Sequence, residues 1–426
     1  MREEQRDLVI IGGGPAGLAA AVKAWKLGVE NITLIDESER LGGVLPQCIH
    51  TGFGLHYFRE DLTGPEFAAR LVGELEETGV EVLSGAYAAH LEVKPNGLKE
   101  VYGYRYGEAF KIESKAIIYA AGCRERTRFE ANILGDRSSG VYTAGEAQAL
   151  MDVYGVLPGR EIVIVGSGDI GLIMARRFAL EGARVKGVVE IMPYPGGLMR
   201  NVVQCLEDFG IPLYLSHIVS EVKGSGRVES VKIMKVDEDL NPVEGSGFEV
   251  KCDAVILAVG LKPRVELLVR AGAQIDDATG GPVVNDWLET SLPGVFAAGN
   301  VLVVNDLVDY AAEQGERAAE SAFKFISEGG LPRFWAKRLI RGRNVRLIIP
   351  QLISYPQDVM FYGRVRTPEE DVEVRFEEVG KVFRLPAVRP PEMFRVRIPA
   401  GDLSKLSGEK LTVNIVRVGR NGGAFW

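Results

Sequence analysis

Cysteine is scarce in this chain of 426 residues, and its four copies are far apart. They form no C-x-x-C pair and no cluster with histidine: Cys48, Cys123, Cys205 and Cys252. A zinc site or an iron–sulfur cluster needs several closely spaced ligands, so we expect no metal site held by this chain alone. Scattered cysteines are instead typical of reduced thiols in a reducing compartment.

Long apolar runs and an excess of positive charge are also missing. No uninterrupted apolar segment approaches the roughly 20 residues that a membrane-spanning helix needs. The formal net charge of −8 argues against a nucleic-acid partner. Residues 1–7 are charged and lead directly into an apolar strand, so no signal peptide is predicted and we expect a cytoplasmic protein.

Glycine, in contrast, is abundant, and it gathers in two loops of the same design. The first loop, Gly12-Gly13-Gly14-Pro15-Ala16-Gly17, follows the apolar run 8–11. The second, Gly166-Ser167-Gly168-Asp169-Ile170-Gly171, follows the apolar run 162–165. An acid ends the next apolar strand at the same spacing after each loop, and these acids are Asp36 and Glu190.

This pattern is typical of dinucleotide binding. The first glycine permits a tight turn, the second lets the backbone approach a pyrophosphate, and the third lets helix and strand pack closely. The helix N-terminus attracts the pyrophosphate, and the acid binds a ribose. One such loop can arise by chance, but two copies with matching acids predict two dinucleotide sites. The predicted contacts are Gly12, Gly14, Pro15, Ala16, Gly17 and Asp36 in the first site, and Gly166, Gly168, Asp169, Ile170, Gly171 and Glu190 in the second.

Glu190 also bears on which nicotinamide cofactor is bound. A carboxylate there binds a 2′-hydroxyl and repels a 2′-phosphate, and residues 191–194 offer no cation. The sequence therefore favours NAD. The alternative is that Glu190 merely faces solvent.

The remaining patterns predict an internal repeat followed by a different domain. A helix is predicted over 65–78, a strand meander over 80–93, 101–106 and 109–113, and a separate strand over 116–120. From residue 159 the order starts again, with a second meander over 213–251 and a strand over 254–258. A helix near 311–325 is predicted to end at Pro332. Residues 331–426 alternate in the manner of β-strands.

With these motifs in view, residues 5–330 resemble the two-dinucleotide-binding-domain flavoproteins, the superfamily of glutathione reductase and thioredoxin reductase. The resemblance implies FAD at the first loop and NAD(P)H at the second. It implies an α/β fold with two Rossmann-like, three-layer ββα domains, the second inserted in the first, and a small β-rich C-terminal domain. The expected bounds are 1–122 and 263–330 for the FAD domain, 123–262 for the NAD domain, and 331–426 for a C-terminal interface domain.

The same resemblance implies further cofactor contacts. The family's linking motif matches Ala120-Ala121-Gly122, with its counterpart at 258–260, and its late flavin motif matches residues 294–300. The usual aspartate of that late motif is Asn300 here. Residues 313–315 fall where a helix N-terminus meets the flavin pyrimidine. The implied additional contacts are Glu37, Gly42, Gly43, Val44, Ala121, Gly122, Gly299, Asn300 and Gln314 for FAD, and Gly260 for NAD.

A narrower resemblance involves residues 41–50 and 62–66. These segments look like the FAD/NAD subunits of multi-component dehydrogenases, including a companion flavoprotein of anaerobic glycerol-3-phosphate dehydrogenase and alpha-type subunits of dye-linked opine and amino-acid dehydrogenases. It implies electron transfer between FAD and NAD(H) within a hetero-oligomer, whose partner flavoprotein or iron–sulfur protein oxidises the organic substrate. Two other readings are a stand-alone NADH oxidase or NADH:acceptor reductase, and a non-catalytic flavin-binding module.

The chemistry near the flavin is predicted to lack a dithiol. Cys48 has no second cysteine within the few residues that a relay requires, so hydride is expected to pass directly between nicotinamide and flavin. The resemblance places Gln47, Cys48 and His50 near the isoalloxazine as candidate catalytic residues. The alternative is that Cys48 is a small buried filler and His50 a hydrogen-bonded core group.

One segment reverses the acidic character of the chain. Residues 333–346 carry six cations and no acid: Arg333, Lys337, Arg338, Arg341, Arg343 and Arg346, with Phe334 and Trp335 beside them. This pattern predicts a peripheral docking face for an acidic partner or an anionic membrane surface. A solvated basic linker between domains is the alternative.

Overall fold

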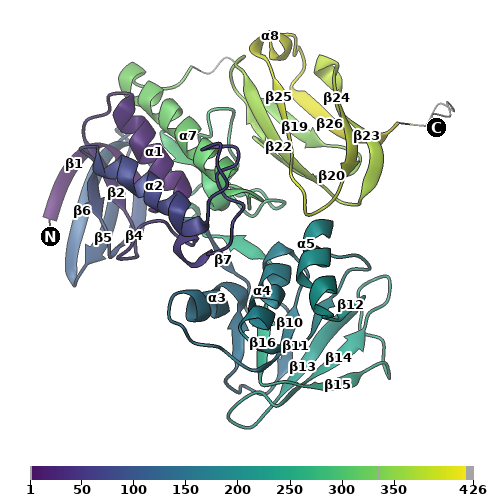
Figure 1. The fold of residues 1–426 in the computed structure, drawn as a ribbon. Helices are drawn as coiled ribbons and strands as arrows, with labels where there is room; N and C mark the ends of the chain where they lie inside the picture. The colour runs from purple at the N-terminus through teal and green to yellow at the C-terminus, as the bar shows by residue number, and fades with distance from the viewer. Residues whose placement is uncertain (1, 333–335, 419–426) are drawn as a thin grey trace. The chain divides into compact units, whose positions relative to one another are not determined.

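The computed structural model describes residues 2–332 and 336–418 (Figure 1). Within these residues the chain divides into two compact units. Unit 1 comprises the residues up to Pro46, His50–Cys123, and those from Pro263 onward, whereas unit 2 comprises Gln47–Ile49 and Arg124–Lys262. Strands β7 (Cys123–Glu125) and β17 (Leu261–Pro263) pair where the chain passes between the units.

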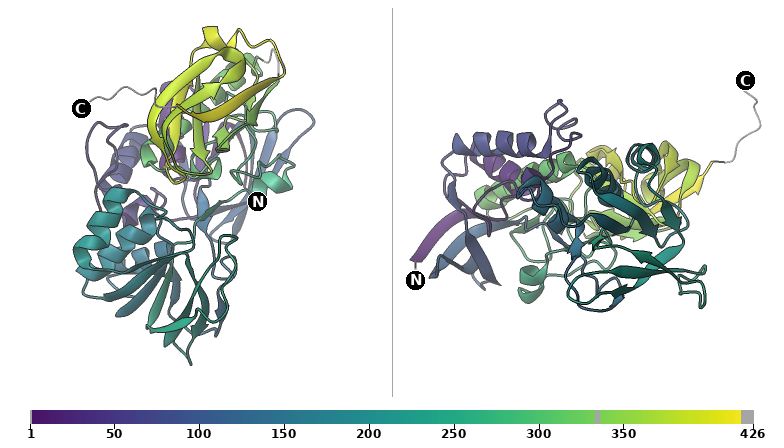
Figure 2. Two further views of the ribbon diagram at one scale, coloured as in Figure 1. Left: turned by 90° about the vertical axis from the view of Figure 1, so that its right-hand side faces the viewer. Right: turned by 60° about the horizontal axis from the view of Figure 1, so that its bottom comes forward.

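Unit 1 is built on a sheet whose strand order is β3-β2-β1-β6-β5-β4, with β18 beside β6. Strands β3, β2, β1, β6 and β18 run parallel, whereas β4, β5 and β6 form an antiparallel meander. Helix α1 packs against both α2 and α7 in one layer (Figure 2). The bounds are β1 Arg2–Ile11, α1 Pro15–Lys26, β2 Ile32–Ile35, α2 Gly64–Glu76, β3 Glu81–Leu83, β4 Ala86–Val93, β5 Lys99–Arg105, β6 Glu108–Tyr119, α6 Glu266–Arg270, β18 Val295–Ala297 and α7 Val308–Glu328.

Unit 2 repeats this plan. Its parallel sheet has the order β12-β11-β10-β16-β9, which corresponds strand for strand to β3-β2-β1-β6-β18. A meander of β13, β14 and β15 forms a second sheet with β8, and α4 packs between α3 and α5. The bounds are β8 Leu134–Gly135, β9 Val141–Thr143, α3 Ala144–Asp152, β10 Glu161–Val165, α4 Asp169–Leu180, β11 Arg184–Glu190, α5 Met199–Cys205, β12 Leu213–Leu215, β13 His217–Lys223, β14 Ser230–Lys235, β15 Phe248–Lys251 and β16 Ala254–Leu257.

The layering of unit 2 follows from alternation along its strands. Ile162 and Ile164 of β10 lie in the core shared with the helices, whereas Val163 and Val165 lie in the core shared with the meander. Successive strand side chains point to opposite faces, so a run of apolar residues buries both sides of the sheet. The predicted α/β class with two Rossmann-like, three-layer domains is confirmed.

The last part of unit 1 is β-rich, as predicted. Its strands form two sheets, of order β21-β19-β26-β23-β24 and β20-β22-β25, around a separate core of Val, Ile, Leu and Phe side chains. The bounds are β19 Lys337–Arg341, β20 Val345–Ile349, β21 Leu352–Ile353, β22 Val359–Val365, β23 Glu369–Phe376, β24 Lys381–Val388, β25 Phe394–Ile398, α8 Ala400–Leu403 and β26 Lys410–Arg417. No helix among the described residues has the length and apolar character needed to cross a bilayer.

Two expected element boundaries were wrong. The strands predicted over 109–113 and 116–120 are one strand, β6, because β1 pairs with it along most of its length. Helix α7 ends at Glu328 rather than at Pro332, because Gly329 adopts a left-handed φ of 72° and stops the helix. Gly329, and not Pro332, therefore ends the helix.

Close contact between α1 and α7 depends on a glycine in α7. A Cβ on Gly315 would lie 2.0 Å from the carbonyl oxygen of Ala16, so no larger residue fits without moving a helix. Gly73 in α2 is the opposite case, because it is exposed and a Cβ there would meet nothing within 4 Å.

These two glycines give a matched pair of stability variants. We expect Gly315→Ala to destabilise the protein by at least about 1–3 kcal/mol, the usual cost of overpacking. Gly73→Ala is expected to stabilise it by up to about 1 kcal/mol, because alanine is the better helix former. Thermal unfolding of both variants checks this. Equal melting temperatures would contradict the close packing of α1 on α7.

Candidate functional site

Both glycine loops connect a parallel strand to a helix, β1 to α1 and β10 to α4. Their first glycines, Gly12 and Gly166, have φ values of 111° and 98°. A Cβ at these positions would lie 2.3 Å from the Ala120 oxygen and 2.2 Å from the Ala258 oxygen. Conformation and space therefore both require glycine at the turn.

The third glycines are also required by packing within the protein. A Cβ on Gly17 would lie 1.8 Å from the oxygen of Gly12, and one on Gly171 would lie 2.2 Å from the oxygen of Gly166. In each loop, the third glycine therefore lies directly against the backbone of the first. This contact draws the first turn of the helix against the end of the strand.

The second glycines differ, because the protein itself does not require them. A Cβ on Gly14 would meet only the Gly43 Cα at 3.9 Å, and one on Gly168 would meet nothing within 4 Å. Both are N-caps without a side-chain cap, so the first-turn backbone amides receive no hydrogen bond from the cap residue. An open, uncapped helix N-terminus fits a pyrophosphate, and hence a dinucleotide, in each loop.

The two acids make the same hydrogen bonds. Asp36 accepts from the amides of Gly13 (2.5 Å) and Ser38 (2.8 Å). Glu190 accepts from the equivalent amides of Ser167 and Met192, each at 2.9 Å. Glu190 is only 7% exposed, so the alternative that it merely faces solvent is wrong. Contact of either acid with a ribose stays a prediction.

A second Gly-Gly pair in unit 2 was missed by the sequence analysis. Gly196-Gly197 follows Glu190 at the same spacing as Gly42-Gly43 follows Asp36. In each unit, the first glycine of the pair donates its amide to the residue after the loop's first glycine: Gly42 to the Gly13 oxygen at 2.9 Å, and Gly196 to Ser167 Oγ at 2.8 Å. The matching spacing was the signal that could have revealed it.

Several predicted contact residues lie around these loops. Pro15 and Ala16 begin α1, and Asp169 and Ile170 begin α4. The remaining positions follow strands or make surface contacts: Ala121 and Gly122 follow β6, Gly260 follows β16, Glu37 pairs with Arg264, and Val44 is 56% exposed. Asp169 Oδ1 accepts hydrogen bonds from Leu198 N at 2.9 Å and Asn201 Nδ2 at 2.6 Å.

Residues of the late flavin motif form a hydrogen-bonded loop in unit 1. Gln314 is buried; its Oε1 accepts from Gly299 N and its Nε2 donates to Asn305 Oδ1, both at 3.0 Å. Asn300 Oδ1 accepts from Asn305 N at 3.0 Å, and its Nδ2 lies 3.6 Å from the Cys123 sulfur. The Gln314 side chain therefore holds this loop from within, and flavin contacts by Gln314 and Asn300 stay predictions.

Asp309 is a site-organising residue that the sequence analysis missed. It lies in the first turn of α7, is 1% exposed, and accepts hydrogen bonds from three amides: Gly54 at 3.2 Å, His56 at 2.9 Å and Tyr57 at 2.8 Å. The carboxylate thereby fixes the loop that follows His50 to the start of α7. Nothing in the local pattern distinguishes this acid from an exposed one, because its partners are distant in sequence.

The three candidate catalytic residues do not all belong to one unit. Gln47 and Cys48 group with unit 2, where Gln47 Nε2 donates to Gly145 O (3.0 Å) and Gln148 Oε1 (3.2 Å). The Cys48 sulfur lies 3.9 Å from Gln148 Oε1. His50 belongs to unit 1, where its Nδ1 is 2.9 Å from the oxygen of Thr51. Their catalytic roles stay predictions.

The environment of Cys48 keeps its thiol protonated. Burial, with a smaller contribution from the Asp152 charge, raises the pKa of Cys48 from an ordinary 9.0 to about 12. A thiolate is the reactive form of cysteine, so this side chain is poorly suited to act as a nucleophile or to form a sulfenic acid at neutral pH.

From residue 337 onward the basic segment is part of the C-terminal fold, so the linker alternative is wrong for these residues. Residues 337–341 form β19 and residues 345–349 form β20. Arg341 pairs with Asp276 at 3.2 Å, and Arg343 pairs with Glu369 at 3.0 Å. Peripheral docking through this segment stays a prediction. Arg333, Phe334 and Trp335 lie outside the described residues.

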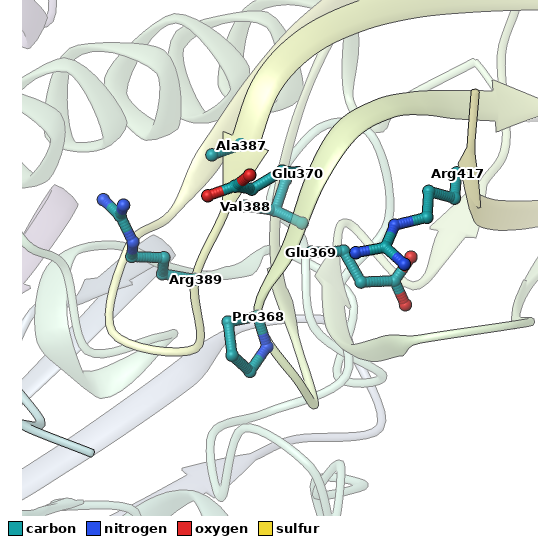
Figure 3. Close-up of a pocket in the computed structure, with 7 residues that line it drawn as sticks. All are labelled: Pro368, Glu369, Glu370, Ala387, Val388, Arg389 and Arg417. Atoms are coloured by element: carbon teal, nitrogen blue, oxygen red, sulfur yellow. The ribbon is translucent and has the colours of Figure 1, made fainter. Parts of the chain in front are cut away.

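A shallow pocket of about 240 Å³ lies on the same C-terminal strands (Figure 3). Charged side chains of both signs line it, including Glu369, Glu370, Arg389 and Arg417. It contains no residue of either glycine loop, so it does not belong to the candidate dinucleotide sites.

The open position of Gly168 can be tested directly. Because its Cβ would meet no protein atom, we expect Gly168→Ala to leave the melting temperature and the FAD content unchanged. The methyl group would occupy the space proposed for a pyrophosphate, so the Kd for NADH should rise at least about tenfold. Calorimetric titration measures this. Unchanged NADH affinity would contradict the assignment of this loop.

The protonated state of Cys48 predicts slow alkylation. At pH 8 we expect iodoacetamide to modify Cys48 at least about 100-fold more slowly in the native protein than in the unfolded chain. Mass spectrometry of the Cys48 peptide gives both rates. Rapid native labelling would contradict the raised pKa assigned to Cys48.

The raised pKa of Cys48 also makes the free energy of unfolding depend on pH. Because the folded-state pKa is raised, the contribution of this thiol to the free energy of unfolding is present below pH 9.0 and is lost as the pH rises toward about 12.

Comparison with known proteins agrees with this geometry. One subunit of alkyl hydroperoxide reductase from Pseudomonas aeruginosa is 27% identical over 332 residues, which cover 76% of this chain and 59% of that protein. The HcnB subunit of hydrogen cyanide synthase from Pseudomonas protegens is 28% identical over 322 residues, which cover 69% of this chain and 65% of that protein. The chain thus spans less than two thirds of either relative.

A solved structure shares the fold. Thioredoxin reductase from Lactococcus lactis superposes with a TM-score of 0.63 at 24% identity, over 76% of this chain and 99% of that one. The family model for pyridine nucleotide-disulphide oxidoreductase matches residues 6–315, a range that contains both glycine loops. The chain therefore belongs to the pyridine nucleotide-disulphide oxidoreductase family, whose members bind FAD and NAD(P).

Proposed function

We propose that this protein transfers hydride between NAD(H) and bound FAD, as the electron-transfer subunit of a multi-component dehydrogenase. The observation that carries the proposal is the repeated loop geometry. In both units the first and third glycines are fixed by the protein's own packing, whereas Gly14 and Gly168 adjoin open space at an uncapped helix N-terminus. Two such places in one chain suit two dinucleotides.

Each unit would hold its cofactor through equivalent groups. In unit 1 the first-turn amides of α1 would bind the FAD pyrophosphate and Asp36 a ribose, while Gln314 holds the Gly299 loop in place. In unit 2 the amides of α4 would bind the NAD pyrophosphate and Glu190 the adenosine ribose. The bound cofactors together supply the hydride chemistry, and the protein's contribution is to bind and orient them.

Direct transfer, without a protein dithiol, is supported by the cysteines. Cys48 is followed in the chain by Cys123, which belongs to the other unit, so no vicinal pair is available from sequence. The raised pKa of Cys48 also disfavours thiolate chemistry. This proposal sets the chain apart from those family members that pass electrons through a disulfide.

NAD is proposed in preference to NADP because of charge. The Glu190 carboxylate is buried beside the second loop, and residues 191–197 include no cation. A 2′-phosphate placed there would meet like charge without a compensating arginine or lysine.

A role as one subunit of a larger enzyme is supported by the relatives. The two relatives from Pseudomonas described above are both named as enzyme subunits. The β-rich C-terminal strands follow residue 315, where the family match ends, and we propose that they form the partner-binding domain. The resemblance of residues 41–50 and 62–66 suggests a glycerol-3-phosphate dehydrogenase type, in which the partner oxidises the substrate.

Anaerobic reduction of the purified yellow protein tests the proposal. We expect NADH to bleach the visible flavin band at least about tenfold faster than NADPH at equal concentration, because the Glu190 charge opposes a 2′-phosphate. Stopped-flow absorbance measures both rates. Gly168→Ala is the matched control and should slow the NADH reaction at subsaturating concentrations.

Other outcomes would favour the other readings. If neither nucleotide bleaches the flavin although both cofactors bind, the non-catalytic reading is supported. If the single chain turns over NADH rapidly with oxygen or a quinone and no other subunit, a stand-alone oxidase or reductase is supported. Copurification of a second flavoprotein or an iron–sulfur protein with the tagged chain, expressed in its native host, would support the multi-subunit proposal.

A further inference from the structure

The two glycine loops differ at the position after the first glycine, which is Gly13 in unit 1 and Ser167 in unit 2. Ser167 has no exposed surface, although it carries a hydroxyl group. A buried hydroxyl must be hydrogen-bonded to avoid a desolvation cost, so its partners indicate what it does.

The Ser167 hydroxyl joins three parts of the second site. It donates to Glu190 Oε2 at 2.6 Å and accepts from the amide of Gly196 at 2.8 Å. The Ser167 amide donates to the same Glu190 oxygen at 2.9 Å. One oxygen of the carboxylate is therefore held by two donors from one residue, and the other accepts from Met192 N at 2.9 Å.

The segment 193–197 is seated closely on the N-terminus of α4. A Cβ on Gly196 would lie 3.3 Å from Gly168 N, and one on Gly197 would lie 2.8 Å from Asp169 Oδ1. Pro193 and Pro195 restrict the backbone of this segment. Within the segment, Gly196 donates to the Ser167 side chain at 2.8 Å, and Leu198, the next residue after the segment, donates to Asp169 Oδ1 at 2.9 Å.

Unit 1 achieves the same attachment without a side chain. Gly42 donates directly to the backbone oxygen of Gly13 at 2.9 Å, and Asp36 is held by backbone amides. In unit 2 the longer acid, Glu190, and the second Gly-Gly pair are both tied to a single hydroxyl. In unit 2, therefore, one side chain hydrogen-bonds to both the acid and the facing segment, and a substitution at Ser167 removes both of these bonds.

We propose that Ser167 is a positioning residue that determines nicotinamide cofactor specificity. It fixes the Glu190 carboxylate and holds the 193–197 segment against the glycine loop, so that the adenosine ribose is accepted with a 2′-hydroxyl but not with a 2′-phosphate. This inference rests on the proposed preference for NAD(H). Without the hydroxyl, Glu190 Oε2 keeps one donor, the Ser167 amide, and the Gly196 amide loses its acceptor. The carboxylate then becomes able to turn away from the site.

The test is equilibrium binding of NAD⁺ and NADP⁺ to the FAD-loaded protein, measured by calorimetric titration. In Ser167→Ala we expect the Kd for NAD⁺ to rise about tenfold, the size expected for one charge-assisted hydrogen bond. The Kd for NADP⁺ should stay equal or fall, so that the discrimination between the two nucleotides drops at least about tenfold.

Two further variants separate positioning from general damage. Ser220→Ala removes another hydroxyl from unit 2, one that donates to Lys232 O at 3.2 Å, and should leave the discrimination unchanged. Ser167→Thr keeps a hydroxyl and should restore most of it. Circular dichroism establishes that each variant is folded, and if Ser167→Ala does not fold, the Ser167→Cys variant, whose sulfur is a weaker hydrogen-bonding group, takes its place.

The outcomes separate this inference from the proposed hydride transfer. Equal discrimination in Ser167→Ala and Ser220→Ala would overturn the role of Ser167, as would a wild-type protein that binds NADP⁺ as tightly as NAD⁺. Strong discrimination that is lost only in Ser167→Ala would support it, even if NADH failed to bleach the flavin. That failure would overturn only the proposed hydride transfer.

Discussion

Contact between the first and third glycines of each loop is the constraint on which both candidate sites depend. The absence of a Cβ at Gly17 and Gly171 lets each helix begin directly against the carbonyl of the loop's first residue. The helix N-termini beside Gly14 and Gly168 receive no side-chain cap. The site is a consequence of backbone packing, because the groups that would face a pyrophosphate are amides rather than side chains.

The repeat preserves this backbone arrangement while changing the side chains that stabilise it. Strand order, glycine contacts, the two amides on each acid and the Gly-Gly pair recur in both units. Asp36 with Gly13 and Glu190 with Ser167 are two solutions to the same geometric problem. Glu190 is longer than Asp36 but accepts from the equivalent backbone amides, and the Ser167 hydroxyl supplies an additional donor to its carboxylate. The two positions therefore have to be considered as a pair.

Much of this could be predicted from sequence because the determining contacts are local. The glycine spacing, the apolar run before each loop and the acid after each second strand are short-range patterns that predicted both candidate sites, and the family resemblance that these motifs carry implied the α/β class. The hydrogen bonds of Asp309 and those by which Gln314 holds the Gly299 loop were missed. Their partners are distant in the chain, and the residue type alone does not show whether a carboxylate or an amide is buried. The Gly196-Gly197 pair was visible in the spacing, but its meaning required the contact with Ser167.

The start of α7 is where the loop of the late flavin motif and the C-terminal strands converge. Asp306 pairs with Arg364 and accepts from the Met393 amide at 2.6 Å, while Arg395 pairs with Glu313 and lies 4.1 Å from the centre of the Tyr310 ring. Partly buried charges of this kind are costly to separate, because each would be left without its partner. The same helix end carries Asp309 and Gln314, so the geometry of the Gly299 loop is set jointly by α7 and by the domain packed against it. A β-rich domain attached in this way is part of the structural support of the Gly299 loop, and its sequence is constrained by that role as well as by any partner it binds.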